Sequence, residues 1–446
     1  RHVIILRGSK IYSLTVIDEE NRVLCYNDIE REILKILRVK INEDDEPLCL
    51  LTSLPRESWA RARNVLLETN RDAMRILDTS LFVLSLDSVS PGDTKTCLEG
   101  DGWDAAAMRQ ALCGDVGEDR HWQPRHFDKL TVHVAPDSSA SFLFEHSPYD
   151  AVPLFRMFSD VYLDTTGVET LLKLPSFSSN SCLRDIIIRR DEITIQKDLK
   201  LASQKFRELC NVTQVFPVVI SGYGKQRFKS WGLSPDGICQ IAFQMAYYVL
   251  HGAKSYPSMS VYESVATNKF RHGRTEAGRT VTNSSSKFVV RAATLMMRDP
   301  HSASRTSKLE GEIAIELRNM LKFACEEHSR RLQDSGRGHG VDRHLFSLYK
   351  IALERGSSLP SLYKDPLWAR LNTSILSTSR VDATHFATFI SYGAVCSEGY
   401  GVPYMIGKNA VRIGLTSFSS PPDVSGGFGG VGSSDGTAAN DSKTGT

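Results

Sequence analysis

The sequence lacks a long apolar run and an excess of charge of either sign. No uninterrupted apolar stretch approaches the roughly 18 residues that a membrane-spanning helix needs. The 54 basic and 52 acidic side chains leave a formal charge of +2, which gives no general field for a nucleic-acid backbone. We therefore expect no nucleic-acid partner, and any anion-binding site must be local.

The sequence also lacks a C-x-x-C pair. Its cysteines are odd in number and scattered along the chain, at positions 25, 49, 97, 113, 182, 210, 239, 325 and 396. Such a distribution is typical of free thiols in a reducing compartment, so we predict no structural zinc and no other metal site. The chain begins at Arg1 without a methionine or a targeting segment, and we expect it to be a piece of a longer protein.

What the sequence does contain is a mixture of strand-like and helix-like segments. Apolar runs predict strands at 3–6 and 11–17, and periodic apolar stripes predict helices at 28–38 and near 59–67. This mixture indicates an α/β fold. Residues 93–123 have few periodic apolar positions and are expected to form a loop-rich connection.

The length of 446 residues favours two domains. We place their boundary after residue 187, because Ile186–Ile188 begins a new strand-like run and a long polar helix is expected at 195–210. The predicted units are a first domain at 1–187 and a second at 188–420. A low-complexity tail at 421–446 is expected to be disordered.

One histidine lies where a strand is expected to become a helix. Residues 130–134 and 141–144 alternate as two strands of a hairpin, and an apolar helical stripe follows Pro148. His146 lies between them, and neutral imidazole is well matched to proton transfer near pH 7. Asp150 follows four residues later and could orient the ring. From the pattern alone, a structural histidine is the alternative.

A compact group of cations follows a predicted strand near residue 220. The strand runs into Gly222 and Gly224, and then come Lys225, Arg227 and Lys229. The spacing of a P-loop is absent, because a glutamine follows Lys225. Solvated surface lysines are the alternative to an anion site. The segment from Ser234 to Asp236 predicts a helix start, with a serine cap and a proline in the first turn.

Three further polar segments have unremarkable interpretations when taken alone. Hydroxyl groups at 262, 264 and 275 suit turns and helix ends, and Arg343 could form an ion pair with Asp342 or Glu354. In the tripeptide Ser377–Ser379 the two serines would project to one side of a strand, with the threonine on the other.

Taken in order, these segments resemble the carnitine/choline acyltransferases. The resemblance is carried by Arg125-His-Phe-Asp-Lys129, Glu145-His-Ser-x-x-Asp150, Gly224-Lys-x-x-x-Lys229, Tyr262-Glu-Ser264, Gly273-Arg-Thr-Glu276 and Ser377-Thr-Ser379. It extends to about Ser420. It implies two domains of mixed β-sheet flanked by helices, as in CoA-dependent acyltransferases, with an active-site tunnel between them.

The resemblance also implies a role for each segment. Acyl-CoA would be a cosubstrate, carnitine the acyl acceptor, and no cofactor would be bound permanently. The catalytic residues would be His146 as the base, Asp150, and Ser379 as the oxyanion donor. Coenzyme A would be held by Lys225 and Lys229 at its 3′-phosphate and by Asp236 at its adenosine end. The carboxylate of carnitine would be bound by Tyr262, Ser264, Thr275 and Arg343.

Departures from the family pattern leave alternatives open. A strand is expected at 388–395. Within it the bulky Ile390, or its neighbour Phe389, stands near a position that limits acyl length in the family. Other segments are most similar to long-chain members, and we favour a long-chain enzyme. Arg380 follows the serine motif in place of an uncharged residue, and Ala151 replaces a glycine. A short- or medium-chain enzyme and a non-catalytic acyl-CoA-binding relative are therefore the rivals. By resemblance we expect a monomer on the matrix side of the mitochondrial inner membrane, with peripheral membrane association, and the peroxisome is the alternative location.

Overall fold

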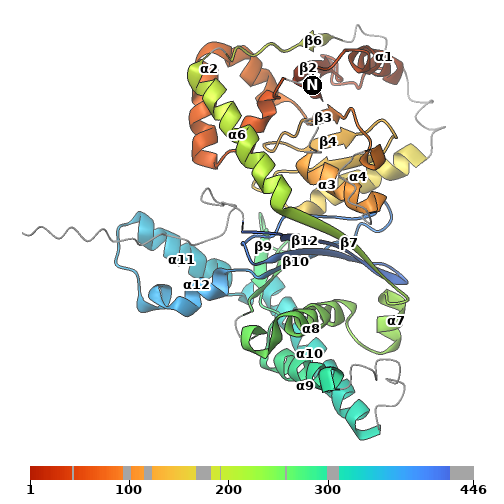
Figure 1. Ribbon diagram of the computed structural model, residues 1–446, viewed down its shortest axis with the longest axis vertical. Coiled ribbons are helices and arrows are strands. Elements are labelled where there is room, and N and C mark those ends of the chain that lie inside the picture. The colour runs from red at the N-terminus through yellow and green to blue at the C-terminus, as the bar shows by residue number, and fades with distance from the viewer. Residues whose placement is uncertain are drawn as a thin grey trace, which may run out of the picture.

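The computed structural model describes residues 1–42, 45–93, 102–114, 123–166, 182–190, 192–256, 259–298 and 311–421. These residues form two parts, each built on one six-stranded mixed sheet (Figure 1). Helices flank both sheets, which confirms the predicted α/β class. In Figure 1 the first part lies above the second sheet, and a group of helices lies below that sheet.

The first sheet has the strand order β5-β4-β3-β1-β2-β6. Its strands are β1 (His2–Arg7), β2 (Lys10–Thr15), β3 (Val83–Leu86), β4 (Thr131–Val134), β5 (Ala140–Leu143) and β6 (Leu183–Asp185). The pairs β1–β3 and β3–β4 are parallel, and the other pairs are antiparallel. The four apolar residues of β1 are all buried, as expected for a central strand that is covered on both faces.

Helices cover this first sheet. They are α1 (Tyr26–Leu37), η1 (Leu48–Ser53), α2 (Arg56–Thr79), η2 (Pro91–Asp93), α3 (Trp103–Cys113), α4 (Ala151–Thr166) and α6 (Ile193–Val212). Helix α6 buries Ile195, Leu199 and Phe206 in one core with η1 and α2. This packing favours a division between the two parts at Val212 rather than at residue 187, and the boundary itself stays a prediction.

The second sheet has the strand order β7-β12-β11-β10-β8-β9. Its strands are β7 (Thr213–Ser221), β8 (Val261–Ala266), β9 (Thr275–Gly278), β10 (Leu376–Arg380), β11 (Tyr400–Ile406) and β12 (Ala410–Phe418). Strand β10 is parallel to both of its neighbours, while the remaining pairs are antiparallel. One face packs on α8 through a core that includes Cys239, Val402 and Tyr404.

The remaining helices belong to this second part. They are α7 (Lys225–Ser230), α8 (Pro235–Ser255), α9 (Asn283–Arg298), α10 (Gly311–Asp334), η6 (Ser335–His339), α11 (Asp342–Glu354), η7 (Ser361–Lys364) and α12 (Pro366–Asn372). Helix α8 begins as predicted, because Ser234 accepts a hydrogen bond from the Gly237 amide and Pro235 takes the first helical position. Helices α11 and α12 extend to one side of the molecule (Figure 1).

Two local predictions are wrong. The segment 93–123 contains the helix α3, whose buried residues apart from Met108 are small or polar and gave no apolar stripe. The segment 388–395, expected to be a strand, is irregular. It lies against the second sheet, where the hydroxyl of Tyr392 donates to the Ser377 carbonyl and the hydroxyl of Thr416 donates to the Tyr392 carbonyl.

Other predictions concern thiols, the tail and membrane segments. No disulfide joins the eight cysteines within the described ranges, which agrees with the predicted reduced thiols. The expected tail at 421–446 lies outside the described residues except for its first position. Among the helices that the structure describes, none combines the length and the apolar character required to cross a bilayer.

Candidate active site

His146 lies in the turn between β5 and α4, as the sequence predicted. Strands β4 and β5 form the expected hairpin, with Val132 opposite Phe142. The turn is fixed by Glu145, whose carboxylate accepts hydrogen bonds from the amide and the hydroxyl of Ser147. The side chain of His146 is 61% exposed. The imidazole is therefore accessible to a substrate and is not a buried structural group.

Two charged side chains lie beside the imidazole of His146, whose ring also contacts that of Phe144. The Asp150 carboxylate lies 3.6 Å from Nδ1. Arg274 comes from the residue before β9 in the second part, and its Nη2 donates to the His146 carbonyl at 2.6 Å and to Asp150 at 2.9 Å. These bonds are shorter than the 3.4 Å between Arg274 Nη2 and His146 Nδ1. The carboxylate favours a proton on Nδ1, whereas the guanidinium, which can only donate, favours Nδ1 as an acceptor, so these two neighbours favour opposite tautomers of the ring.

Arg274 is the site residue whose role was not predicted. It also donates to the Ser147 carbonyl at 2.6 Å, so one guanidinium holds both the histidine turn and Asp150. In the sequence, the only indication of Arg274 was its position in the segment 273–276, which resembles the family. Arg274 is 128 residues from His146. A long-range contact of this kind has no signal in local periodicity.

The predicted hydroxyl groups of β8 and β10 lie on one face of the second sheet. Ser377 pairs with Tyr262, so Ser264 and Ser379, two residues further along each strand, share that face. Thr378 is on the opposite face, where it donates to the Tyr262 carbonyl and accepts from a glutamine of α8. The two serines therefore point to the same side of β10, as predicted.

This hydroxyl face is the one that packs against the first part. Ser379 pairs with Pro403 on β11, and the next residue, Tyr404, belongs to the opposite face against α8. Met405, which alternates with Tyr404, packs in one cluster with Phe155 of α4. Ser379 therefore lies on the side of the sheet that faces α4, the helix that follows His146.

Arg343 is brought together with two of the predicted substrate residues. Its Nη2 donates to the Tyr262 hydroxyl at 3.2 Å, and its Nε lies 3.5 Å from the Thr275 carbonyl. An ion pair with Asp342 was the alternative, but Asp342 pairs with Arg279. The guanidinium of Arg343 is exposed and keeps N–H groups for an anionic ligand.

Lys225 and Lys229 lie one turn apart on α7. The helix begins where Gly224 contacts the β11–β12 turn so closely that an added Cβ would lie 2.5 Å from the Lys408 carbonyl oxygen. Lys225 has one carboxylate neighbour, Asp382, at 3.4 Å. Arg227 instead stacks on aromatic rings. The two lysines thus form a local cationic surface on a nearly neutral chain.

Asp236 is not part of that surface, because its carboxylate is buried behind the second sheet. It accepts a hydrogen bond from the Tyr404 hydroxyl at 2.7 Å and lies 3.9 Å from Arg380. Beside it, Glu263 contacts His328 at 2.8 Å. Burial, together with the charge of Asp236, raises the pKa of Glu263 despite the opposing contact with His328.

The same buried group is where the described residues could hold a cation. Ligand atoms of Asp236, Glu263 and His328 all lie within 4.8 Å of one another. Contacts with Arg380 and His328 already place positive or protonatable groups beside both carboxylates. These neighbouring side chains therefore account for the charge of the two carboxylates without a metal ion.

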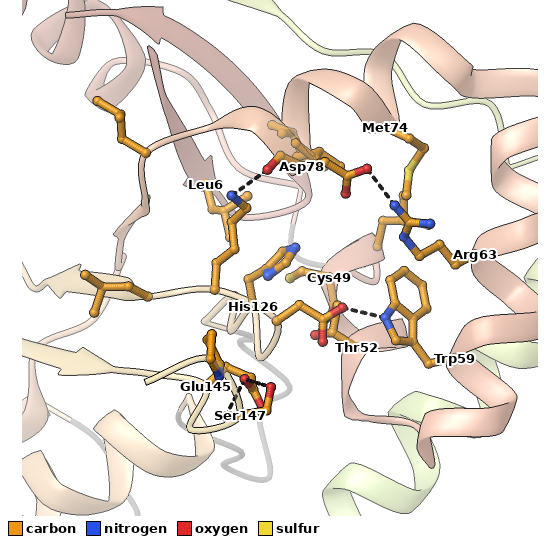
Figure 2. Close-up of a pocket in the computed structure, with 18 of the residues that line it drawn as sticks. Leu6, Cys49, Thr52, Trp59, Arg63, Met74, Asp78, His126, Glu145 and Ser147 are labelled. Atoms are coloured by element: carbon orange, nitrogen blue, oxygen red, sulfur yellow. Dashed lines mark hydrogen bonds and ion pairs between the residues drawn. The ribbon is translucent and has the colours of Figure 1, made fainter. Parts of the chain in front are cut away.

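A cavity of about 690 Å³ opens beside the histidine turn (Figure 2). It is lined by α2, by the segment 126–130 and by the turn residues Glu145 and Ser147, all within the first part. His126 lies in its wall, and burial lowers the pKa of this imidazole. This cavity is distinct from the tunnel expected between the two parts, and that tunnel stays a prediction.

Comparisons with known proteins find the family that the sequence resembles. Residues 1–428 match the family model described as Choline/Carnitine o-acyltransferase. Mitochondrial carnitine O-palmitoyltransferase 2 of Homo sapiens is 29% identical over 428 residues, which are 94% of this chain and 59% of that protein. The carnitine O-acetyltransferase of Columba livia is 28% identical over 429 residues, which are 95% of this chain and 64% of that protein.

The chain spans about three fifths of the length of the palmitoyltransferases it matches. A solved structure, the epimerization domain from the third module of tyrocidine synthetase B, aligns with 75% of this chain and 74% of that chain at 10% identity, with a TM-score of 0.29. The sequence match to the family, in contrast, covers every described residue. The chain belongs to the choline/carnitine O-acyltransferase family.

Proposed function

We propose that this chain transfers an acyl group reversibly between coenzyme A and the hydroxyl of carnitine. The observation that carries the proposal is the exposed imidazole of His146, with Asp150 and Arg274 on its Nδ1 side. In the tautomer that Asp150 favours, with the proton on Nδ1, the imidazole has Nε2 available as a general base. Membership of the family supports carnitine and the thioester as the two substrates.

The proposed reaction needs one base and one oxyanion donor. Nε2 of His146 takes the hydroxyl proton of carnitine, and the alkoxide attacks the thioester carbonyl. The Ser379 hydroxyl donates to the oxyanion of the tetrahedral intermediate. The carbon–sulfur bond then breaks, and the imidazolium of His146 returns the proton to the thiolate of coenzyme A. No covalent acyl-enzyme forms.

A long-chain acyl group and a mitochondrial location are the finer parts of the proposal. They are supported by the similarity to mitochondrial carnitine O-palmitoyltransferase 2 from several animals. We propose the matrix side of the inner membrane as the site of action, with peripheral attachment and a monomeric state. A short- or medium-chain transferase is the alternative, supported by the similarity to carnitine O-acetyltransferase.

A turnover assay combined with calorimetry tests this function. Release of coenzyme A is measured with carnitine and acetyl-, octanoyl- or palmitoyl-CoA, and binding of coenzyme A is measured separately. We expect the highest kcat/KM with palmitoyl-CoA, and a maximum at acetyl-CoA would contradict the long-chain preference. Binding without turnover of any thioester would instead favour a non-catalytic acyl-CoA-binding protein.

We expect replacement of Lys225 and Lys229 by alanine to weaken coenzyme A binding by roughly 10- to 100-fold. The reason is that each ammonium group can donate a charge-assisted hydrogen bond to the 3′-phosphate. Calorimetry should compare coenzyme A with 3′-dephospho-coenzyme A. The unchanged protein should prefer the phosphorylated ligand, and the double variant should bind the two equally. If the double variant still binds coenzyme A more tightly than 3′-dephospho-coenzyme A, the 3′-phosphate binds at another site. Lys254→Ala, at the far end of α8, is the control.

Replacement of Arg343 by alanine should raise the KM for carnitine by roughly 10- to 100-fold, because a charge-assisted hydrogen bond to the carboxylate is lost. Choline, which has no carboxylate, should be used about equally poorly by the variant and the unchanged protein. Arg355→Ala, at the other end of α11, should keep the KM for carnitine. An unchanged KM in Arg343→Ala would remove this arginine from the substrate site.

A further inference from the structure

Arg343 lies in the first turn of α11, a helix that is attached to the second sheet at this end. None of the residues described in α11 is buried, and the helix extends to one side of the molecule (Figure 1). The amide and Nε of Arg343, in contrast, both contact β9. The direction of the guanidinium therefore depends on how the first turn is held, rather than on packing along the whole helix.

A carboxylate from β9 holds this first turn. Oε1 of Glu276 accepts a hydrogen bond from the Arg343 amide at 3.2 Å and another from the Ala277 amide at 2.7 Å. The first amide groups of a helix have no acceptor within the helix, and they carry a partial positive charge. A carboxylate supplies both an acceptor and the opposite charge. Glu276 thus caps α11 from another element of the chain.

The glycine shortly before α11 leaves room for this carboxylate. A Cβ added to Gly340 would lie 2.2 Å from Cγ of Glu276 and 2.7 Å from its Oε2. The φ of Gly340 is −69°, which any residue can adopt, so the backbone conformation does not require glycine. Glu276 itself is only 6% exposed. The missing side chain at Gly340 therefore permits the close approach of a buried carboxylate to the start of the helix.

The strand that carries Glu276 also carries a proposed substrate residue. Glu276 and Thr275 are neighbours, so they point to opposite faces of β9. Ala277, two residues after Thr275, pairs with Ser264, which places Thr275 on the face of the proposed substrate hydroxyls. Arg343 contacts both residues of the strand, because its amide donates to Glu276 and its Nε lies 3.5 Å from the Thr275 carbonyl.

A separate ion pair attaches α11 to the sheet. Asp342 pairs with Arg279, and Arg279 also donates to the Leu371 carbonyl at the end of α12 at 2.8 Å. These contacts do not involve Glu276. Loss of the Glu276 carboxylate should therefore loosen the first turn of α11 without detaching the helix from the second part.

We propose that Glu276 is a positioning residue for Arg343. This inference rests on the proposed transfer to carnitine, and it adds a residue that the substrate does not touch. The carboxylate of Glu276 fixes the Arg343 amide, and the guanidinium is thereby held 3.2 Å from the Tyr262 hydroxyl, where the carboxylate of carnitine would bind. Glu276 then acts on the affinity for carnitine rather than on the chemical step.

The experiment changes the contact from both sides. Glu276→Gln keeps an acceptor oxygen but loses the charge, Glu276→Ala loses both, and Gly340→Ala displaces the intact carboxylate. Glu312→Gln, in the exposed first turn of α10, is the matched control. The KM for carnitine and kcat should be measured with palmitoyl-CoA at saturation. Hydrogen exchange of the segment 341–348 should be measured by mass spectrometry on the same proteins.

We expect Glu276→Ala and Gly340→Ala each to raise the KM for carnitine by roughly tenfold, which is the effect of losing one charge-assisted hydrogen bond. Glu276→Gln should raise it by only about threefold, because an acceptor remains. In all three variants kcat should stay within about threefold of the original, and Glu312→Gln should change neither constant. An unchanged KM in Glu276→Ala, or a kcat that falls as far as the KM rises, overturns the inference.

A double variant tests whether Glu276 acts through Arg343. In Glu276→Ala/Arg343→Ala the KM should lie within about threefold of that of Arg343→Ala, since no guanidinium remains to be positioned. Effects that multiply would overturn the inference but leave acyl transfer intact. If the unchanged protein does not use carnitine, the proposed function fails, and hydrogen exchange decides separately. Exchange at 341–348 that is several-fold faster in Glu276→Ala, but not in Glu312→Gln, would support the positioning role, and unchanged exchange would overturn it.

Discussion

Replacement of His146 by alanine should lower the rate of coenzyme A release from palmitoyl-CoA and carnitine by roughly 10²- to 10⁴-fold, the usual contribution of a general base. The physical reason is that a carnitine hydroxyl is a weak nucleophile until a base removes its proton in the transition state. Because the side chain of His146 is 61% exposed, its removal should leave the unfolding transition almost unchanged. The loss should appear in kcat rather than in protein stability.

The control for this variant is another exposed histidine. His251 lies near the end of α8, where its ring contacts Tyr400, and His251→Ala should keep most of the activity. Coenzyme A should still bind His146→Ala with its original Kd, because the proposed phosphate site is on α7. A His146→Ala rate above a few per cent of the original would remove this residue as the base.

The local parts of the fold could be predicted from the sequence, because they depend on neighbouring residues. The alternation of Val132 and Phe142 indicated the β4–β5 hairpin, and the serine cap with Pro235 indicated the start of α8. Helix α3 was not predicted, since its buried residues include alanines and Gln110 in place of an apolar stripe. Gln110 is buried because its side-chain amide donates to Asp87, 23 residues earlier.

The site could be predicted only where a segment carries its own chemistry. His146 and the two lysines of α7 were apparent from their places beside predicted elements, although Asp236 proved to be buried behind the sheet. Arg274 acts on His146 across 128 residues, and the contact exists only because the two parts pack together. The pairing of segments that are distant in the chain is set by tertiary packing, which periodicity does not encode.

The second large effect is expected in stability, at a buried ion pair beneath the first sheet. Arg125 donates to Asp87 at 3.0 and 2.8 Å, and the two side chains are only 1% and 2% exposed. Further contacts join Arg125 to the Gln110 carbonyl and Asp87 to the Ser85 hydroxyl. Asp87→Ala should lower the free energy of unfolding by about 3–5 kcal/mol, because it leaves a guanidinium buried without its carboxylate.

The double variant Asp87→Leu/Arg125→Met distinguishes the loss of the ion pair from the burial of an unpaired charge. It should be clearly more stable than Asp87→Ala, since two apolar side chains of similar size leave no buried ion. Asp160→Ala removes the exposed pair between Arg156 and Asp160, and it should cost less than about 1 kcal/mol. Urea unfolding of the four proteins measures all of these differences. If Asp87→Ala and the double variant were equally stable, the buried, unpaired Arg125 would not be the cause of the loss.

The contribution of Asp87 should also depend on pH in a defined direction. Burial alone would raise the pKa of this carboxyl, but the charge and hydrogen bonds of Arg125 outweigh burial and lower the pKa below its usual value. A carboxyl whose pKa is lower in the folded state contributes its full stabilisation above the unfolded pKa, which is about 4. This stabilisation is lost as the pH falls through the folded pKa. The stability difference between the unchanged protein and Asp87→Ala should therefore be constant near pH 7 and narrow under acid conditions. A difference that widens as the pH falls would mean that the carboxylate is not the stabilised form.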